Sequence, residues 1–187
     1  IWGTVALDYQ DVVAHESCAR RLADPGDVAA TLWEKQAQDA YYSDVILVPP
    51  TRTFRDALVL ELGDLTVELH HLPGHTHDCT VAFAPALGVL LAGDTVETPL
   101  PVVPENPPLD LWLTKLAVWQ QDPRVKSVVP SHGPVGGREL IEHTTSYLEA
   151  LQKGEDTALP ENLSAFYRQM HKANRKHANQ EHAKHYI

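Results

Sequence analysis

The stretch Leu72-Pro73-Gly74-His75-Thr76 follows an alternating apolar segment, and Leu90-Leu91-Ala92-Gly93-Asp94 closes the next apolar run. A third stretch, Pro130-Ser131-His132-Gly133-Pro134, follows two valines. In each one a side chain that can bind a metal stands beside glycine at the end of a strand-like segment. A strand end holds a side chain stiffly, and glycine lets the backbone approach an ion closely. One Gly-His pair is usually a capping or buried histidine, but three such motifs in order favour a shared metal site.

The three motifs together resemble the later motifs of the metallo-β-lactamase-fold hydrolases, in particular the glyoxalase II and lactonase-like branch. The resemblance extends from about Val12 to Leu151. It implies an α/β fold, a four-layer αββα sandwich with a two-metal site along one edge of the paired sheets. It also implies that His75 binds the first metal and His132 the second, while Asp94 bridges both and is the catalytic carboxylate.

The sequence departs from this family at its signature motif, His-x-His-x-Asp-His, which is absent. The segment Val12-Val13-Ala14-His15-Glu16 resembles the stretch that comes directly after that signature. We therefore expect residues 1–153 to be the C-terminal part of a metallo-β-lactamase-like domain whose N-terminal portion is missing. Residues 154–187 are expected to form a C-terminal helical extension. The alternative is a ligand-poor, non-catalytic relative that uses the fold for binding or assembly.

Composition narrows the class of protein and its partners. A length of 187 residues with 43% hydrophobic content suits a single globular domain with a substantial core. No apolar run approaches the ~18 residues of a membrane span, and a cytoplasmic protein without membrane contact is expected. Cys18 and Cys79 are the two cysteines, and their spacing suggests neither a thiolate zinc site nor a disulfide framework.

Charge is distributed unevenly along the chain. The formal net charge is −10, and the last 27 residues, 161–187, carry 2 acidic and 5 basic side chains. Residues 1–160 are therefore acidic and would repel a phosphate backbone, so nucleic acid is not expected as a partner. The expected partners are a small-molecule substrate and, as an open alternative, a second copy of the chain.

Hydrophobic periodicity predicts an ordered series of helices and strands. The predicted elements are helices at 15–23 and 26–41, a strand at 45–48, a hairpin at 58–62 and 65–69, strands at 81–84 and 88–92, a helix from 109, a strand at 125–129, and a helix from about 137 to 151. A last helix carries Leu163, Phe166, Tyr167 and Met170 on one face, and it is expected to dock by its first half only.

Several residues near the motifs carry weaker hypotheses. Five prolines within 99–108 predict a stiff wall of the pocket. Asp78 would either orient a ligand imidazole or cap a turn, and His77 would lie just outside the metal ligands or face the substrate. The remaining histidines are expected on the surface or in packing roles, and those of the polar tail are His171, His177, His182 and His185.

The expected chemistry is hydrolysis by a metal-activated water. Two divalent ions about 3.5–4 Å apart lower the pKa of a bound water and polarise the bond under attack. A bridging carboxylate such as Asp94 is a harder ligand than a thiolate, which suits Zn and also Fe or Mn. The resemblance thereby favours an ester, thioester or lactone as substrate, with two zinc ions as the expected cofactor.

Overall fold

The computed structural model describes residues 2–24, 26–157 and 159–184, and these belong to two compact units, Ile1–Asp56 and Ala57–Ile187. The first unit contains, in order, the 3-10 turn η1 (Thr4–Ala6), strand β1 (Val13–His15), helices α1 (Glu16–Ala23) and α2 (Gly26–Gln38), the 3-10 turn η2 (Ala40–Tyr42) and strand β2 (Arg52–Phe54). Strands β1 and β2 pair in parallel. His15 caps α1, since its Nδ1 accepts a hydrogen bond from the N–H of Ser17 at 3.2 Å.

The strand predicted at 45–48 is wrong, because those residues have no regular structure and the chain enters a strand only at Arg52. The side chain of Gln36 donates to the carbonyl of Val45 at 3.0 Å, and so occupies an acceptor that a neighbouring strand would need. Pro49 and Pro50 follow and bring no backbone N–H. Apolar content alone therefore does not make this segment a strand.

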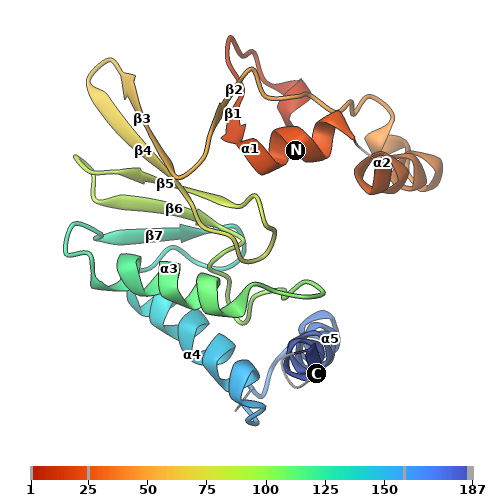
Figure 1. Cartoon of the computed structure of the whole chain (residues 1–187), viewed down its shortest axis with the longest axis vertical. Helices are drawn as coiled ribbons and strands as arrows, with labels where there is room; N and C mark the ends of the chain where they lie inside the picture. The colour runs from red at the N-terminus through yellow and green to blue at the C-terminus, as the bar shows by residue number, and fades with distance from the viewer. Residues whose placement is uncertain (1, 25, 158, 185–187) are drawn as a thin grey trace. The chain divides into compact units, whose positions relative to one another are not determined.

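The second unit is built on a five-stranded sheet in the order β3-β4-β5-β6-β7 (Figure 1). Its elements are β3 (Ala57–Leu62), β4 (Leu65–His71), β5 (Thr80–Ala84), β6 (Val89–Gly93), β7 (Ser127–Pro130) and the helices α3 (Leu109–Gln121), α4 (Glu139–Lys153) and α5 (Ala165–Lys184). The first four strands form an antiparallel meander, which contains the predicted hairpin as β3 and β4 and the predicted strands 81–84 and 88–92 as β5 and β6. β7 joins parallel to β6 after the chain has crossed over through α3.

One face of this sheet carries the core. Phe83 of β5 and Leu90 of β6 lie opposite each other, so their side chains share this face. Both are buried against the helices, and the ring of Phe83 lies 5.4 Å from that of Trp119 on α3. α4 packs beside α3, as Figure 1 shows. This burial anchors the strands whose ends carry the motifs.

The other face of the sheet is also apolar but is less covered. Directly opposite residues on the five strands bring Leu58, Leu69, Ala82, Leu91 and Val129 to this face. Leu91 is 51% exposed, and Leu62 on the edge strand is 58% exposed. The α/β class is confirmed, and a sheet with helices on one face is one half of the sandwich that the resemblance implies.

Helix α5 docks along more of its length than the sequence predicts. The prediction of docking by the first half only is wrong, because Asn174 and Ala178 are buried as well. The predicted surface positions of His171 and His177 are also wrong: both are half-buried and bonded, to Tyr147 Oη at 3.0 Å and to the carbonyl of Val103 at 2.8 Å. His185 and the side chain of His182 lie outside the described residues. None of the described helices is both long and apolar enough to span a bilayer.

The contact between His171 and Tyr147 predicts a dependence of stability on pH. Burial lowers the pKa of His171 below 6.5, the Arg175 guanidinium lowers it further, and Asp156 opposes the shift. On acidification the unfolded chain takes up the proton first, so this contribution is complete above pH 6.5 and declines as the pH falls toward the folded pKa. We expect the melting temperature to fall more steeply between pH 7.5 and 5.5 in the wild type than in His171→Gln. Equal slopes would contradict the assignment.

The exposed apolar face predicts how residues 1–187 behave when expressed alone. Uncovered apolar surface of this kind favours association, so we expect oligomeric or molten material that binds a hydrophobic dye. Leu62→Lys and Leu91→Lys should increase the monomer fraction in gel filtration, whereas Val118→Lys, at an exposed position of α3, should not. A monomer that melts in one cooperative transition without these changes would refute the prediction.

Candidate metal centre

Strand direction brings the three motifs to one edge of the sheet. β5 is antiparallel to both β4 and β6, so β4 and β6 run the same way, and β7 is parallel to β6. These three strands therefore end at the same edge, at His71, Gly93 and Pro130. Asp94 directly follows β6, while His132 and His75 follow their strands after one and three intervening residues.

Asp94 and His132 lie side by side at this edge. Asp94 Oδ1 is 3.6 Å from His132 Nε2, and the two side chains are 39% and 61% exposed. The N–H of Ser131 donates to the carbonyl of Gly93 at 3.1 Å, which continues the pairing of β6 and β7 into the motifs. Gly93 has φ +57°, a left-handed conformation that glycine adopts without strain and that turns the chain into Asp94.

The turn after His132 is packed against the segment that follows Asp94. The N–H of Thr98 donates to the carbonyl of His132 at 3.2 Å. Gly133 has φ +106°, and a Cβ at this position would lie 1.9 Å from Thr98 Oγ1. Only glycine allows this approach, so the two loops that carry Asp94 and His132 hold each other in place.

His75 is held by a backbone carbonyl in the proline-rich loop. Its Nδ1 lies 3.0 Å from the carbonyl oxygen of Val102. A carbonyl can only accept, so Nδ1 carries the proton and the lone pair of the neutral ring is on Nε2. This is the state in which histidine binds a metal, with its second nitrogen fixed by another group. Val102 is thus the group that holds His75 Nδ1, and the two roles predicted for Asp78 stay predictions.

The glycine before His75 also has a packing role. A Cβ at Gly74 would lie 2.4 Å from the ring of Trp112. The indole Nε1 of Trp112 donates to the carbonyl of Thr95 at 3.1 Å, immediately after Asp94. Trp112 thus lies against both motif loops from the core side and fixes their spacing.

The three predicted ligands do not complete a metal site by themselves. Among the residues that the structure describes, no group of three or more His, Cys, Asp or Glu side chains is arranged to hold an ion. Two four-coordinate ions need about eight bonds, of which two imidazoles and one bridging carboxylate supply four. Nitrogen and carboxylate ligands fit zinc, so the donor set suits the metal while the ligand number is incomplete.

Two further titratable side chains, Cys79 and Glu97, lie close in sequence to the predicted ligands. Burial raises the pKa of the Cys79 thiol against the hydrogen bonds from Thr76, and the carboxylates of Asp78 and Asp94 add to the rise. Cys79 is therefore a neutral thiol. Glu97 is 1% exposed: its Oε1 accepts from Tyr167 Oη at 2.9 Å, and no described residue hydrogen-bonds to Oε2.

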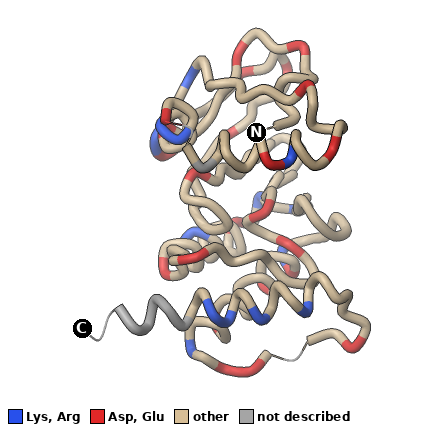
Figure 2. The backbone as a smooth tube through the Cα atoms, turned by 90° about the vertical axis from the view of Figure 1, so that its right-hand side faces the viewer, with Lys and Arg blue, Asp and Glu red and all other residues tan. Residues whose placement is uncertain are grey.

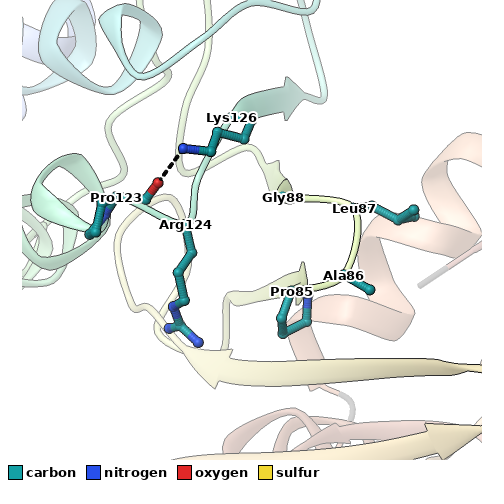
Figure 3. Close-up of a pocket in the computed structure, with 7 residues that line it drawn as sticks. All are labelled: Pro85, Ala86, Leu87, Gly88, Pro123, Arg124 and Lys126. Carbon is teal, nitrogen blue, oxygen red and sulfur yellow. Dashed lines mark hydrogen bonds between the residues drawn. The ribbon is translucent and has the colours of Figure 1, made fainter.

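The edge opposite the motifs offers a cavity of about 420 Å³ between the β5–β6 turn and the start of β7 (Figure 3). Its two cations are already engaged. Lys126 Nζ donates to the carbonyl of Pro123 at 2.7 Å, and Arg124 is paired with Asp122 and Glu68. The Arg124 guanidinium holds the pKa of Asp122 below its usual range. These cations support local structure, and the motif edge remains the candidate site.

Comparison with known proteins agrees with the motifs and the fold. The family model of the metallo-beta-lactamase superfamily matches residues 2–132, and the chain belongs to that superfamily. Over 114 residues the chain is 31% identical to a metallo-beta-lactamase type 2 of Bacteroides fragilis, a match that covers 56% of this chain and 45% of that protein. Over 106 residues it is 35% identical to a linear primary-alkylsulfatase of a Pseudomonas species, covering 51% of this chain and 19% of that protein. The chain thus spans less than half the length of these relatives.

Two solved structures share the fold at low identity. A metallo-beta-lactamase family protein from Thermus thermophilus superposes with a TM-score of 0.57 at 21% identity, covering 76% of this chain and 54% of the other. An archaeal metallo-beta-lactamase superfamily protein from Sulfolobus tokodaii gives a TM-score of 0.61 at 12% identity, covering 91% and 69%. The similarity to the glyoxalase II and lactonase-like branch and the expected missing signature stay predictions.

The close approach at Gly133 can be tested by substitution. Gly133→Ala strains the backbone, which alone costs about 1–3 kcal/mol, and adds a Cβ that clashes with Thr98. We therefore expect the free energy of unfolding to fall by more than the backbone strain alone would cause. Gly63→Ala is the matched control, because Gly63 has φ +69° but nothing lies within 4 Å of the added Cβ. Adding Thr98→Ala to Gly133→Ala should recover part of the loss in denaturant melts. An equal cost at both glycines would contradict the packing argument.

Proposed function

We propose that the intact protein is a metal-dependent hydrolase that uses a metal-activated water on an ester, thioester or lactone. The observation that carries this proposal is the arrangement at the motif edge. Asp94 Oδ1 and His132 Nε2 lie 3.6 Å apart, and His75 Nδ1 donates to the carbonyl of Val102, which leaves Nε2 as the nitrogen available to a metal. Neutral imidazoles and a carboxylate at the ends of rigid strands are the groups that a hydrolytic metal centre requires.

When bound, two divalent ions would supply a hydroxide near neutral pH and would polarise the bond under attack. The residues of this chain hold and orient that chemistry. Asp94 offers two oxygens and so suits a bridging position, while His75 and His132 each offer one nitrogen. The stiff loop 99–108 lies beside His75 through Val102 and would exclude water from one side of the substrate.

The substrate class follows from the carboxylate at position 94 and from the relatives. A carboxylate bridge favours esters, thioesters or lactones by the resemblance stated above. The Pseudomonas relative is named a linear primary-alkylsulfatase, which extends the ester class to sulfate esters. The Bacteroides relative is named a metallo-beta-lactamase. Zinc is the proposed metal, with iron or manganese as alternatives.

The second candidate function is binding or assembly by a relative that does not catalyse. The incomplete ligand set within the described residues favours it. Metal analysis of the full-length protein, purified without chelator, separates the two proposals. A hydrolase should contain close to two ions per chain, and substantially less than one ion would sink the hydrolase proposal.

Substitution of the three ligands should give distinct losses of metal. Asp94→Ala removes a ligand from both ions, so metal content should fall toward zero and turnover should be abolished. His132→Ala and His75→Ala should each empty one site, leaving about half of the metal and much weaker catalysis. Metal content is measured by elemental analysis, and turnover with ester, thioester, lactone and alkyl sulfate substrates.

The control for these variants is His143→Ala. His143 is exposed on α4, and its Nε2 bonds to the carbonyl of Pro99 at 2.7 Å rather than to one of the three predicted ligands. Its loss should leave metal content unchanged. The ligand assignment fails if Asp94→Ala keeps full occupancy and turnover, or if His143→Ala proves as costly as His75→Ala.

A further inference from the structure

A fully buried amide lies in the middle of α5. Asn174 is 0% exposed, and its side chain makes three hydrogen bonds that use both of its N–H groups and its oxygen. Oδ1 accepts from the N–H of Val103 at 2.9 Å, and Nδ2 donates to the carbonyl of Pro101 at 2.7 Å and to Tyr147 Oη at 3.0 Å. Two of these bonds thus fix the proline-rich loop, and the third fixes α4.

The bond to Val103 acts on the same peptide group that holds His75. The N–H of Val103 and the C=O of Val102 belong to one planar trans peptide unit, so they point in opposite directions. Asn174 holds the N–H, and the carbonyl is thereby aimed at His75 Nδ1, 3.0 Å away. Hydrogen bonds on both sides of a peptide also polarise it, which makes the carbonyl a stronger acceptor.

The surrounding contacts keep this peptide from rotating. The Asn174 bond to Pro101 holds the loop one residue earlier, and His177 Nδ1 donates to the carbonyl of Val103 one residue later. Tyr147 completes the arrangement: it accepts from Asn174 and donates to His171 Nδ1. Burial raises the pKa of Tyr147 to about 12, so its phenol remains a donor.

We propose that Asn174 is a positioning residue for the metal site, which sets the tautomer and orientation of His75 through the peptide between Val102 and Val103. This role rests on the proposed function only for its consequence in metal binding. Loss of a group that orients a ligand histidine typically costs 10–100-fold in metal affinity. The C-terminal extension would then be a working part of the site.

If Asn174 only stabilised the fold, its loss would lower stability without a specific effect on His75. Tyr147→Phe is the variant that distinguishes this structural role from the positioning role. It removes one of the three bonds of Asn174 and leaves those to Pro101 and Val103 in place. Asn174→Leu has a similar volume and removes all three. Both variants leave buried polar groups unpaired and should lower the melting temperature. Only Asn174→Leu should disturb His75.

The experiment has two measurements on the full-length protein. In the metal-free state, nitrogen-15 NMR of the histidine rings reports the tautomer of His75, whose signals are assigned by their absence in His75→Gln. The wild type and Tyr147→Phe should show the Nδ1–H tautomer, and Asn174→Leu a mixture of both. In competition with a chromogenic chelator, the Kd for Zn²⁺ should rise about 10–100-fold in Asn174→Leu and less than about threefold in Tyr147→Phe.

Each outcome tests either the positioning role of Asn174 or the proposed hydrolase function. A wild-type His75 in the Nε2–H tautomer overturns the positioning role even if the variants do not fold. An unchanged His75 tautomer in Asn174→Leu overturns it, and so does an equal loss of Zn²⁺ affinity in both variants. A wild-type protein that binds no Zn²⁺ overturns the proposed function instead, while the metal-free NMR measurement still decides the role of Asn174.

Discussion

The common direction of β4, β6 and β7 is the constraint on which the candidate site depends. β5 runs between β4 and β6 in the opposite direction, and the α3 crossover brings β7 in parallel to β6. All three motif segments therefore leave the sheet at one edge, with spacings set by backbone hydrogen bonds. A crossover of this kind needs a helix-length connection, so α3 is a condition of the site as well as a cover of the core. The buried face that α3 and α4 share with the sheet stabilises this arrangement.

Close packing at the strand ends explains the glycines beside His75 and His132. Gly133 lies against Thr98 and Gly74 against the ring of Trp112 at distances that exclude any side chain. Glu97, three residues after Asp94, is buried as well, and one of its oxygens has no hydrogen-bond partner among the described residues. An unpaired buried polar atom costs about 1–3 kcal/mol, so the surrounding packing must offset that cost. The core between the sheet and its helices supplies most of the stability. It thereby tolerates the crowded glycines and the partly unpaired Glu97 at the motif edge.

The sequence predicts the hairpins and the order of the motifs because both depend on local patterns. Alternation in 65–69 and the glycines beside His75, Asp94 and His132 are visible within a few residues. The failed strand at 45–48 and the docking of α5 depend on distant partners. Asn174 meets Val103 across 71 positions, and a polar residue on a helix predicts exposure unless such a partner is known. The carbonyl that holds His75 has no sequence signal at all, since every residue carries one.

The polar character of the α5 contact matters for what the helix can do. Basic residues recur along α5 (Figure 2), and Arg168, Lys172 and Lys176 are exposed. The opposite side of the helix is joined to the loop by directional bonds from Asn174 and His177. A purely apolar contact would tolerate small shifts of the helix, whereas these bonds exist in one register only. A displacement of α5 by one turn, about 5.4 Å, would break them together. Because the loop backbone that they hold also bonds to His75, a change in the register of α5 would change the orientation of His75, the predicted metal ligand.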